Sequence, residues 1–289
     1  PDNDAYRRDW SISLANLGGV AEQKGELDAA RAAFAQAEAI SRALAERAPD
    51  NDAYRREWSI SLENLGGVAE KMGQLDGART AFAQVEATRR ALAEGTPDNV
   101  AYRREWSKSL NNLGRIAENK NQLDPARATF AQAEAIRRAL NRGVPDNDAY
   151  RRDWSISLEN LGRVAEKKGE LDAARTAFAQ AEGIRRALAE GAPENDAYRQ
   201  AWAISLHNVS RVAPDLNSAL TSSKRSAECM RELVQRQSGE LRWREELVRY
   251  CLRLLCVCAS NAGHSEQAAK VLAEIETHLE VCLLYTSPS

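Results

Sequence analysis

Residues 14–38 read LANLGGVAEQKGELDAARAAFAQAE, and this stretch returns with few changes at intervals of 48 residues. The segment that precedes it keeps the same interval: PDNDAY or a close variant begins at Pro1, Pro49, Pro97, Pro145 and Pro193. A fixed interval of this length is typical of repeat architectures, in which each copy is one supersecondary unit. The sequence therefore predicts a molecule built from copies of a single 48-residue unit.

Each unit carries the pattern of two long helices joined by a tight turn. In the first copy, apolar residues recur every three or four positions over residues 5–24 and again from about residue 29 to residue 47. Asn3 or Asp4 suits the N-cap of the first helix, and Gly25 suits its C-terminal turn. In the third copy we expect Asp124 to be the N-cap of the second helix and Pro125 its first helical residue.

The apolar residues of each helix fall into one stripe. The stripe of the first helix consists of Tyr6, Trp10, Leu14, Leu17 and Ala21, and that of the second consists of Leu27, Ala30, Phe34, Ala37 and Leu44. One helix pair cannot bury both stripes alone, whereas stacked neighbours can. The expected fold is therefore all-α: a right-handed α-solenoid of stacked antiparallel helix pairs with a 48-residue repeat.

Small and large positions of residues 14–38 match the core of the tetratricopeptide repeat in register. The matching positions are Leu14, Leu17, Gly18, Ala21, Gly25, Leu27, Ala30, Phe34 and Ala37. The usual repeat of that family has about 34 residues, so this unit resembles the long-helix variety of kinesin-light-chain-like proteins and bacterial arrays. The resemblance covers residues 1 to about 212. It implies a non-enzymatic scaffold whose first helices line a concave, protein-binding surface.

The predicted repeat boundaries follow the 48-residue interval up to residue 192 and depart from it beyond that residue. Repeats 1 to 4 take residues 1–48, 49–96, 97–144 and 145–192. Residues 193–238 form a divergent fifth repeat, in which Pro214 should end the first helix a turn early. Residues 239–281 form a degenerate sixth helix pair or cap.

The last eight residues, CLLYTSPS at 282–289, break the helical pattern in the sequence. They match an in-frame translation of a transposase-type sequencing adaptor. We therefore expect this tail not to derive from the natural gene, and the chain to be a fragment of a longer protein.

The composition of the chain narrows the class of protein. The chain has 289 residues, 43% of them hydrophobic, and a net charge of −2, so no basic field indicates a nucleic-acid partner. The apolar run CLRLLCVCA is short and is interrupted by Arg253, which argues against a membrane span. All five cysteines lie beyond residue 228, unlike a secreted disulfide framework, and a reduced, cytoplasmic setting is expected.

No catalytic or metal-binding pattern emerges from the sequence. The histidines are His207, His264 and His278, and Cys251, Cys256 and Cys258 form C-x4-C-x-C. The histidines lack partners at ligand spacing, and cysteines two apart on a helix point to different sides. We interpret the cysteines as small hydrophobic residues. The chain is expected not to be an enzyme and to hold no cofactor and no metal.

A column of asparagines lies opposite the apolar stripe of the first helix when residues are placed at 100° intervals. The asparagines are Asn16, Asn64, Asn112, Asn160 and Asn208. Four positions before them stand Ile12, Ile60, Lys108, Ile156 and Ile204, and three positions after them stand Gly19, Gly67, Arg115, Arg163 and Arg211. The resemblance implies that such asparagines hydrogen-bond to the backbone of an extended peptide. A carboxamide, which both donates and accepts, suits that role.

Two interpretations of this asparagine column stay open. The asparagines either contact a ligand, or bond to one another and to neighbouring backbone to fix the stacking, since recent duplication keeps many columns constant. If they contact a ligand, the arginines of the later copies favour acidic side chains or a C-terminal carboxylate.

Three functions are compatible with this pattern. The first is a scaffold that binds an extended peptide or partner segment in the groove lined by the first helices. The second is a sensor or regulatory arm of a larger bacterial signalling or defence protein. The third is a self-assembling array that stacks through its open ends. In each case we expect a protein partner and neither nucleic acid nor membrane.

Overall fold

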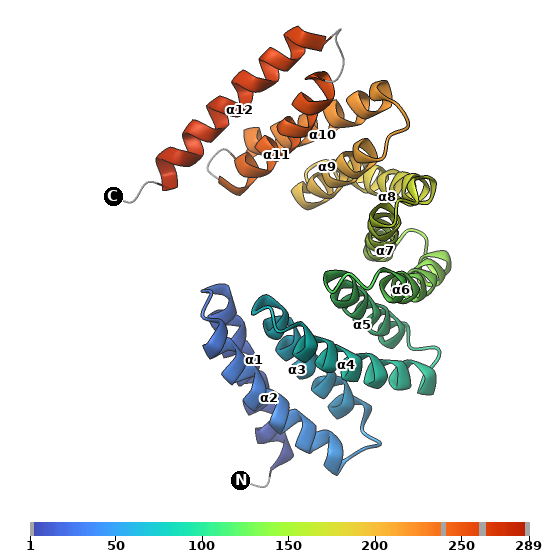
Figure 1. Ribbon diagram of the computed structural model, residues 1–289. Coiled ribbons are helices and arrows are strands. Elements are labelled where there is room, and N and C mark those ends of the chain that lie inside the picture. Colours follow the sequence, from blue (N-terminus) through green and yellow to red (C-terminus); the bar gives the residue numbers. More distant parts are fainter. Residues whose placement is uncertain (1–2, 238–240, 260–263, 287–289) are drawn as a thin grey trace. The chain divides into compact units, whose positions relative to one another are not determined.

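The computed structural model describes residues 3–237, 241–259 and 264–286, and within these ranges every element is a helix (Figure 1). The helices are α1 (Asp4–Gln23), α2 (Leu27–Arg47), α3 (Asp52–Lys71), α4 (Leu75–Gly95), α5 (Val100–Asn119), α6 (Leu123–Gly143), α7 (Asp148–Lys167), α8 (Leu171–Gly191), α9 (Asp196–Arg211), α10 (Leu216–Arg236), α11 (Leu241–Ala259) and α12 (Ser265–Thr286). Two helices lie within each 48-residue interval of residues 1–192.

The first helix of each repeat begins where the sequence predicts. Asn3 caps α1, and the side-chain oxygen of Asn51 caps α3 by accepting the backbone N–H of Ala53 at 3.0 Å. The turn that ends the first helix needs a left-handed residue, which is Gly25 at φ 79° in the first copy and Asn121 at φ 55° in the third. Asparagine can replace glycine there because it tolerates this conformation better than most residues.

The second helices begin earlier than the sequence indicated. The helix α6 starts at Leu123, so Asp124 and Pro125 both lie inside its first turn, and the predicted N-cap is wrong. Pro125 is accepted there because the first N–H groups of a helix have no intrahelical acceptor. Asp124 suits the same turn because its carboxylate lies at the positive end of the helix dipole.

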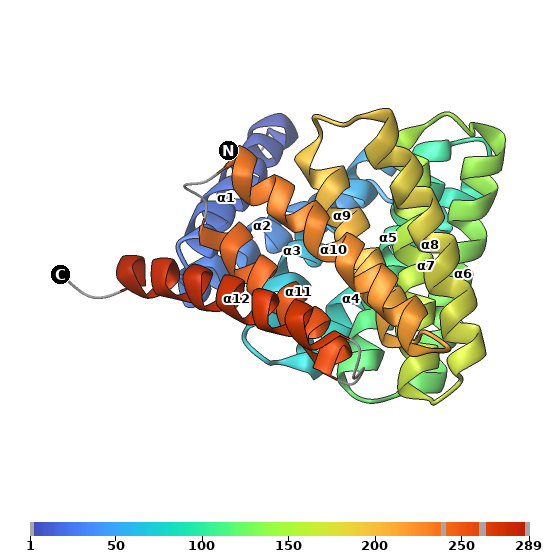
Figure 2. The same ribbon diagram turned by 90° about the horizontal axis from the view of Figure 1, so that it is seen from above.

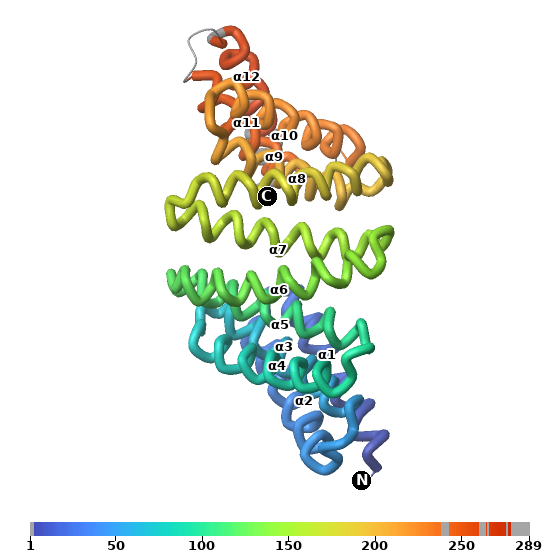
Figure 3. Tube along the Cα trace, turned by 90° about the vertical axis from the view of Figure 1, so that its right-hand side faces the viewer, coloured from blue at the N-terminus to red at the C-terminus, as the bar shows by residue number. Residues whose placement is uncertain are grey.

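The helices form two compact units, Pro1–Gly143 and Val144–Ser289. In the first unit α1 pairs with α2, α3 with α4 and α5 with α6, and these pairs stack through α2 on α3 and α4 on α5 (Figures 1 and 3). In the second unit α7 pairs with α8, α9 with α10 and α11 with α12. Those pairs stack through α8 on α9 and α10 on α11, and Figure 2 shows α11 and α12 side by side. The predicted all-α fold of stacked helix pairs is confirmed.

The core of a repeat lies where a phenylalanine of the second helix meets a glycine of the first. A Cβ atom added at Gly18 would stand 2.7 Å from the Phe34 ring, and one added at Gly114 would stand 2.5 Å from the Phe130 ring. Only glycine therefore allows these helices to approach so closely. Val68 of the next first helix closes the cluster around Phe34, so neighbouring repeats share one core.

The predicted stripe of the first helix divides between two faces. Tyr6, Trp10 and Leu17 are exposed, whereas Ala21 is buried. The three exposed residues lie on the side that, in later copies, is covered by the second helix of the preceding repeat. The indole N–H of Trp58, for example, donates to Glu38 of α2 at 2.9 Å. The expectation that this tryptophan position is a core position is therefore wrong for Trp10, although it is correct for the buried Trp202 of α9.

The divergent C-terminal part is helical over almost all of its described length. The helix α9 has 16 residues whereas α1 has 20, which confirms that the first helix of the fifth copy ends a turn early, ahead of Pro214. The helix α12 continues to Thr286, so the expected break at residue 282 is wrong. Residues 282–286 contain neither glycine nor proline, and nothing in them stops a helix.

Candidate functional site

A pocket of about 350 Å³ lies between α1 and α3, the first helices of repeats 1 and 2. Four residues of the predicted groove line it: Ile12 and Asn16 from α1, and Ile60 and Asn64 from α3. The lining is completed by Ser11, Ala15, Arg56, Glu57 and Ser61. The pocket therefore combines exposed aliphatic side chains with two carboxamides.

Ion pairs between successive first helices form the polar rim of this pocket. Arg8 Nε donates to Glu57 Oε1 at 2.6 Å, and Arg56 Nε donates to Glu105 Oε1 at 2.8 Å. The hydrogen bond that Arg8 donates to Glu57 and the charge of Glu57 raise the pKa of Arg8, and the hydrogen bond that Arg56 donates to Glu105 raises the pKa of Arg56. The charges at the rim are thus compensated in pairs.

The later asparagines of the column bond to the preceding repeat. Asn112 Nδ2 donates to Glu63 Oε1 at 2.9 Å, and Asn208 Nδ2 donates to Glu159 Oε1 at 3.3 Å. In both cases the glutamate stands directly before the asparagine of its own copy. The first copy has Ala15 at that position, and a methyl group cannot accept a hydrogen bond from Asn64. Stacking therefore engages Asn112 and Asn208, whereas the carboxamide of Asn64 faces the pocket.

The arginines of the column already have partners within the chain. Arg115 forms an ion pair with Glu70 and donates to Asn112 Oδ1 at 3.3 Å. Arg211 donates to Glu166 Oε1 at 3.1 Å and also reaches Asn208. A ligand carboxylate would have to displace these glutamates, and the acidic ligand that the sequence favoured stays a prediction.

The remaining residues of the predicted site lie in varied surroundings. Lys108 on α5 is exposed. Asn160 on α7 is buried, and Arg163 donates to its side-chain oxygen at 2.8 Å. Ile156 is half-buried, and Ile204 packs against the hydrophobic core of the second unit. The structure thus places four of the predicted residues in the pocket of the first unit, and it places Asn160 and Ile204 in packed surroundings.

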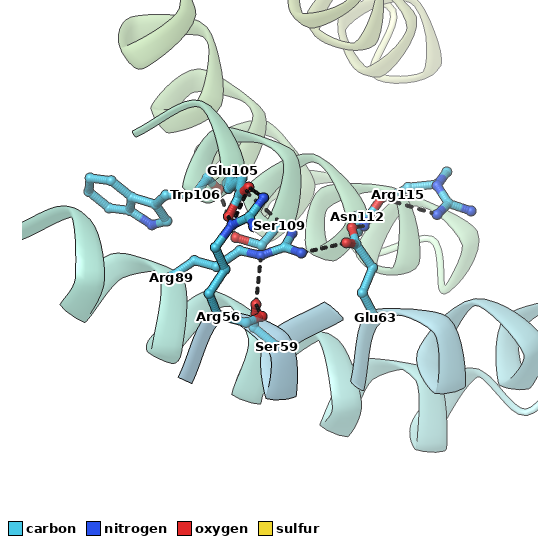
Figure 4. A network of polar contacts seen from close by, with 9 residues as sticks. All are labelled: Arg56, Ser59, Glu63, Arg89, Glu105, Trp106, Ser109, Asn112 and Arg115. Carbon is cyan, nitrogen blue, oxygen red and sulfur yellow. Dashed lines mark hydrogen bonds and ion pairs between the residues drawn. The ribbon is translucent and has the colours of Figure 1, made fainter. Parts of the chain in front are cut away.

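A buried arginine in the second helix escaped the sequence analysis. Arg89 on α4 donates from Nε to Ser59 Oγ at 3.2 Å and from Nη2 to Glu63 Oε2 at 2.5 Å (Figure 4). Glu63 in turn accepts from Asn112, so one carboxylate joins both helices of repeat 2 to the first helix of repeat 3. We call Ser59, Glu63, Arg89 and Asn112 the stacking network.

The same arrangement recurs in repeat 4. Arg185 donates to Ser155 Oγ at 3.2 Å, to Glu159 Oε1 at 2.5 Å and to the backbone oxygen of Ala201 at 3.1 Å. A signal for these arginines exists in the sequence, because Arg89 follows Ala78, Phe82 and Val85 at helical spacing and so falls on the apolar stripe of α4. A charged residue on such a stripe indicates a buried, paired charge.

Several side chains of the C-terminal unit have shifted pKa values. Among its described residues, no cluster of possible metal ligands occurs. Burial, together with the charge of Arg211, lowers the pKa of His207 to about 4, and the His207 ring stands edge-on to Tyr250 at 5.1 Å. Burial raises the pKa of the Cys251 thiol to about 12. Cys251 and Cys258 are buried as predicted, whereas Cys256 is exposed.

Two further findings concern the described ranges as a whole. No group of three His, Cys, Asp or Glu residues there is placed to hold a metal ion. None of the helices in the same ranges combines the length and the apolar character that crossing a membrane would require.

These features define a helical-repeat protein whose first helices carry a small pocket. The family model of the tetratricopeptide repeat matches residues 107–140 and 157–188. Residues 107–140 and 157–188 thus carry tetratricopeptide repeats. No curated protein sequence matches it.

Solved structures share the fold at low sequence identity. BtubC (BKLC) from P. vanneervenii is 15% identical with a TM-score of 0.68, over 91% of this chain and 94% of that one. The apo form of RapI is 11% identical with a TM-score of 0.57, over 93% of this chain and 85% of that one. A putative kinesin light chain with nearly identical TPR-like repeats, from Podosopora anserina, is 17% identical with a TM-score of 0.53, over 83% of this chain and 100% of that one.

Proposed function

We propose that this chain is a non-enzymatic scaffold that binds an extended peptide segment of a partner protein across α1 and α3. The pocket between these helices carries the proposal, because it presents Ile12, Ile60 and the carboxamides of Asn16 and Asn64 on one surface. A carboxamide donates and accepts, so it can bond to a peptide unit whatever the side chain. The match of residues 107–140 and 157–188 to the tetratricopeptide repeat, a family of interaction modules, supports this role.

The chemistry of the pocket favours an aliphatic side chain on the peptide. Its volume of about 350 Å³ is at the small end of the range for ligand pockets, and its accessible lining includes Ile12 and Ile60. The nearby charges of Arg8 and Glu57 neutralise each other, so they offer no unpaired charge to an ionic side chain. The proposed ligand therefore contributes one aliphatic side chain and one or two backbone units.

Peptides selected from a random display library against the full chain would test this proposal. Ile60→Asp should weaken the selected peptides at least about tenfold, because it places a charge in the apolar part of the pocket. Asn64→Ala should weaken them about three- to tenfold through a lost hydrogen bond. Asn119→Ala, on the exposed end of α5 and outside the pocket, is the matched control and should leave binding unchanged.

Selected peptides that bind the Ile60→Asp variant as tightly as the original chain would place the binding surface elsewhere. Circular dichroism of each variant separates loss of binding from loss of fold. The sensor-arm role depends on flanking domains and stays a prediction, for which the full reading frame is the test. Self-assembly through open ends also stays a prediction.

A further inference from the structure

In later copies, the residue three positions after the column asparagine is an arginine with two contacts inside the chain. Arg115 forms an ion pair with Glu70 of the preceding repeat and donates to Asn112 Oδ1 at 3.3 Å. Arg211 repeats both contacts with the equivalent glutamate and asparagine, at 3.1 and 3.4 Å. The guanidinium therefore lies between the glutamate of one repeat and the asparagine of the next.

Repeat 2 has Gly67 at this position but keeps both acceptors of the missing arginine. Glu22 and Asn64 stand where Glu70 and Asn112 stand one copy later. A Cβ atom added at Gly67 would meet no atom within 4 Å, so no packing contact requires glycine there. Gly67 thus leaves open, next to a half-buried carboxylate and a carboxamide, the place that a guanidinium occupies in repeat 3.

The carboxylate of Glu22 has one internal partner and can accept from another donor. Lys71 Nζ stands 3.1 Å from Glu22 Oε1. In repeat 3, Asn119 occupies the position of Lys71 and donates to Glu70 Oε1 at 3.2 Å, while Arg115 binds the same carboxylate. One carboxylate therefore serves both positions, since its two oxygens offer about four lone pairs.

We propose that an arginine side chain of the bound peptide fills this place, pairing with Glu22 and donating to Asn64 above Gly67. This arginine subsite rests on the peptide site proposed for α1 and α3, and it adds a cationic determinant to the aliphatic one. Repeat 4 combines Arg163 with Lys167 at the corresponding positions, so a lysine seven residues after the asparagine is compatible with a guanidinium beside it. A guanidinium suits two separate acceptors better than an ammonium does, because its donors form a planar fork.

The helix α3 sets the spacing of the two determinants on the peptide. Ile60 lines the pocket, and Gly67 follows seven residues later, which is about 10 Å along the helix. Asn64 also lines the pocket and lies one turn before Gly67, so the arginine subsite adjoins the pocket. An extended peptide rises about 3.3 Å per residue. The arginine is therefore expected about three residues from the aliphatic side chain.

Peptides selected from a random display library against the full chain are the probe. Their sequences should share an arginine at about this distance from an aliphatic residue. Replacing that arginine by alanine should weaken a selected peptide about five- to tenfold, and Glu22→Gln in the chain should do the same, because each removes a charged hydrogen bond. Together the two changes should weaken binding little more than either alone, since both remove the same contact.

Gly67→Arg copies repeat 3 and fills the subsite from within the chain, so it should weaken the selected peptides about tenfold. Gly77→Arg is its matched control, because Gly77 is an exposed glycine of α4 with no atom within 4 Å of an added Cβ. Glu46→Gln, at an exposed position of α2, is the control for Glu22→Gln. Both controls should leave binding unchanged, and circular dichroism checks the fold of each variant.

Two results would overturn the arginine subsite and leave the peptide site standing. One is a set of peptides that need Ile60 but share no arginine, and the other is undiminished binding to the Glu22→Gln variant. Peptides that bind the Ile60→Asp variant as tightly as the original chain would instead overturn both proposals. Failure to select any binding peptide would also overturn both.

Discussion

Single residues in this chain acquire their roles from the repeat that lies beside them. Trp10 and Trp58 occupy the same position in their copies, yet only Trp58 has Glu38 within reach. Asn64 and Asn112 likewise differ because Ala15 stands before the first asparagine of the column and Glu63 before the second. A column of identical letters therefore contains residues with different contacts.

His207 should make the second unit less stable as the pH falls. Its pKa is about 4 in the folded chain because burial and the charges of Arg211, Arg253 and Arg249 disfavour the imidazolium, whereas about 6.5 is expected when unfolded. Below about pH 6.5 the unfolded chain binds a proton that the folded chain does not bind. The stability is therefore fully present above about pH 6.5 and is lost as the pH falls toward 4, by about 1–2 kcal/mol at pH 5.

Urea unfolding at pH 7 and pH 5 checks this prediction when the original chain is compared with His207→Gln. Glutamine does not titrate, so the variant should lose about 1–2 kcal/mol less over this interval, while the carboxylates common to both chains cancel. An equal loss in both chains would show that His207 does not control the pH response.

At the scale of the helix pair, a buried arginine of the second helix pairs with a glutamate of the first helix in repeats 2 and 4. Arg89 pairs with Glu63 in repeat 2, and Arg185 pairs with Glu159 in repeat 4. Repeat 1 lacks both partners and has Ser41 and Ala15 at these positions. Repeat 3 keeps a buried arginine, Arg137, which donates to Ser107, but it has Asn111 at the glutamate position.

Arg89→Ser should lower the free energy of unfolding by about 2–4 kcal/mol, because it leaves Glu63 without its charged partner. Glu63→Ala should cost a similar amount. The double variant, which copies Ser41 and Ala15 of repeat 1, should cost about 1–2 kcal/mol less than the sum of the two. Chemical denaturation of the four chains gives this coupling energy directly.

Arg90 is the matched control for this cycle. It is the next residue on α4, half exposed, and stands 3.8 Å from Glu86 in a surface ion pair. Arg90→Ser should change the free energy of unfolding by no more than about 0.5 kcal/mol. Strict additivity of Arg89→Ser and Glu63→Ala would contradict a shared stacking network.

At the scale of the whole molecule, hydrophobic clusters follow the stacking of repeats. The clusters around Phe34 and Phe82 lie wholly within residues 1–143, and those around Phe178 and Met230 lie wholly within residues 144–289. In such arrays stability is a sum of repeat and nearest-neighbour terms, so a set of complete repeats can fold without the rest.

A fragment of residues 1–143 should therefore fold when expressed alone. We expect helical content per residue close to that of α1–α6 in the full chain, and a cooperative transition in urea. A fragment of residues 1–119, which lacks α6, is the control. It leaves Gly114 without Phe130, and it should be less helical per residue. A 1–143 fragment without helical circular dichroism would contradict independent cores.

Much of the fold could be predicted from the sequence because its signals are local. The 48-residue interval, the Asn3 cap and the left-handed turn at Gly25 depend on residues close together in the chain. Helical spacing also separated the asparagine face from the apolar face of the first helix. The second-helix start at Leu123 was missed because Asp124 and Pro125 fit equally well two positions further into the first turn.

The candidate site could be predicted only in part. Ile12, Asn16, Ile60 and Asn64 were predicted from the helical wheel, and the structure brings them into one pocket. The partners of Asn112 and Arg115 were not predicted, because Glu63 and Glu70 lie 49 and 45 residues earlier in the chain.

The sequence by itself determined the helix pairs, their caps and the faces on which residues lie, because these follow from interactions within a turn or two of helix. Only the tertiary structure decided which of those faces are covered and which polar side chains are already bonded. Both depend on the neighbouring repeat. Asn64 therefore lines a pocket and Trp10 is exposed, whereas Asn112 and Trp58 form hydrogen bonds to the preceding repeat.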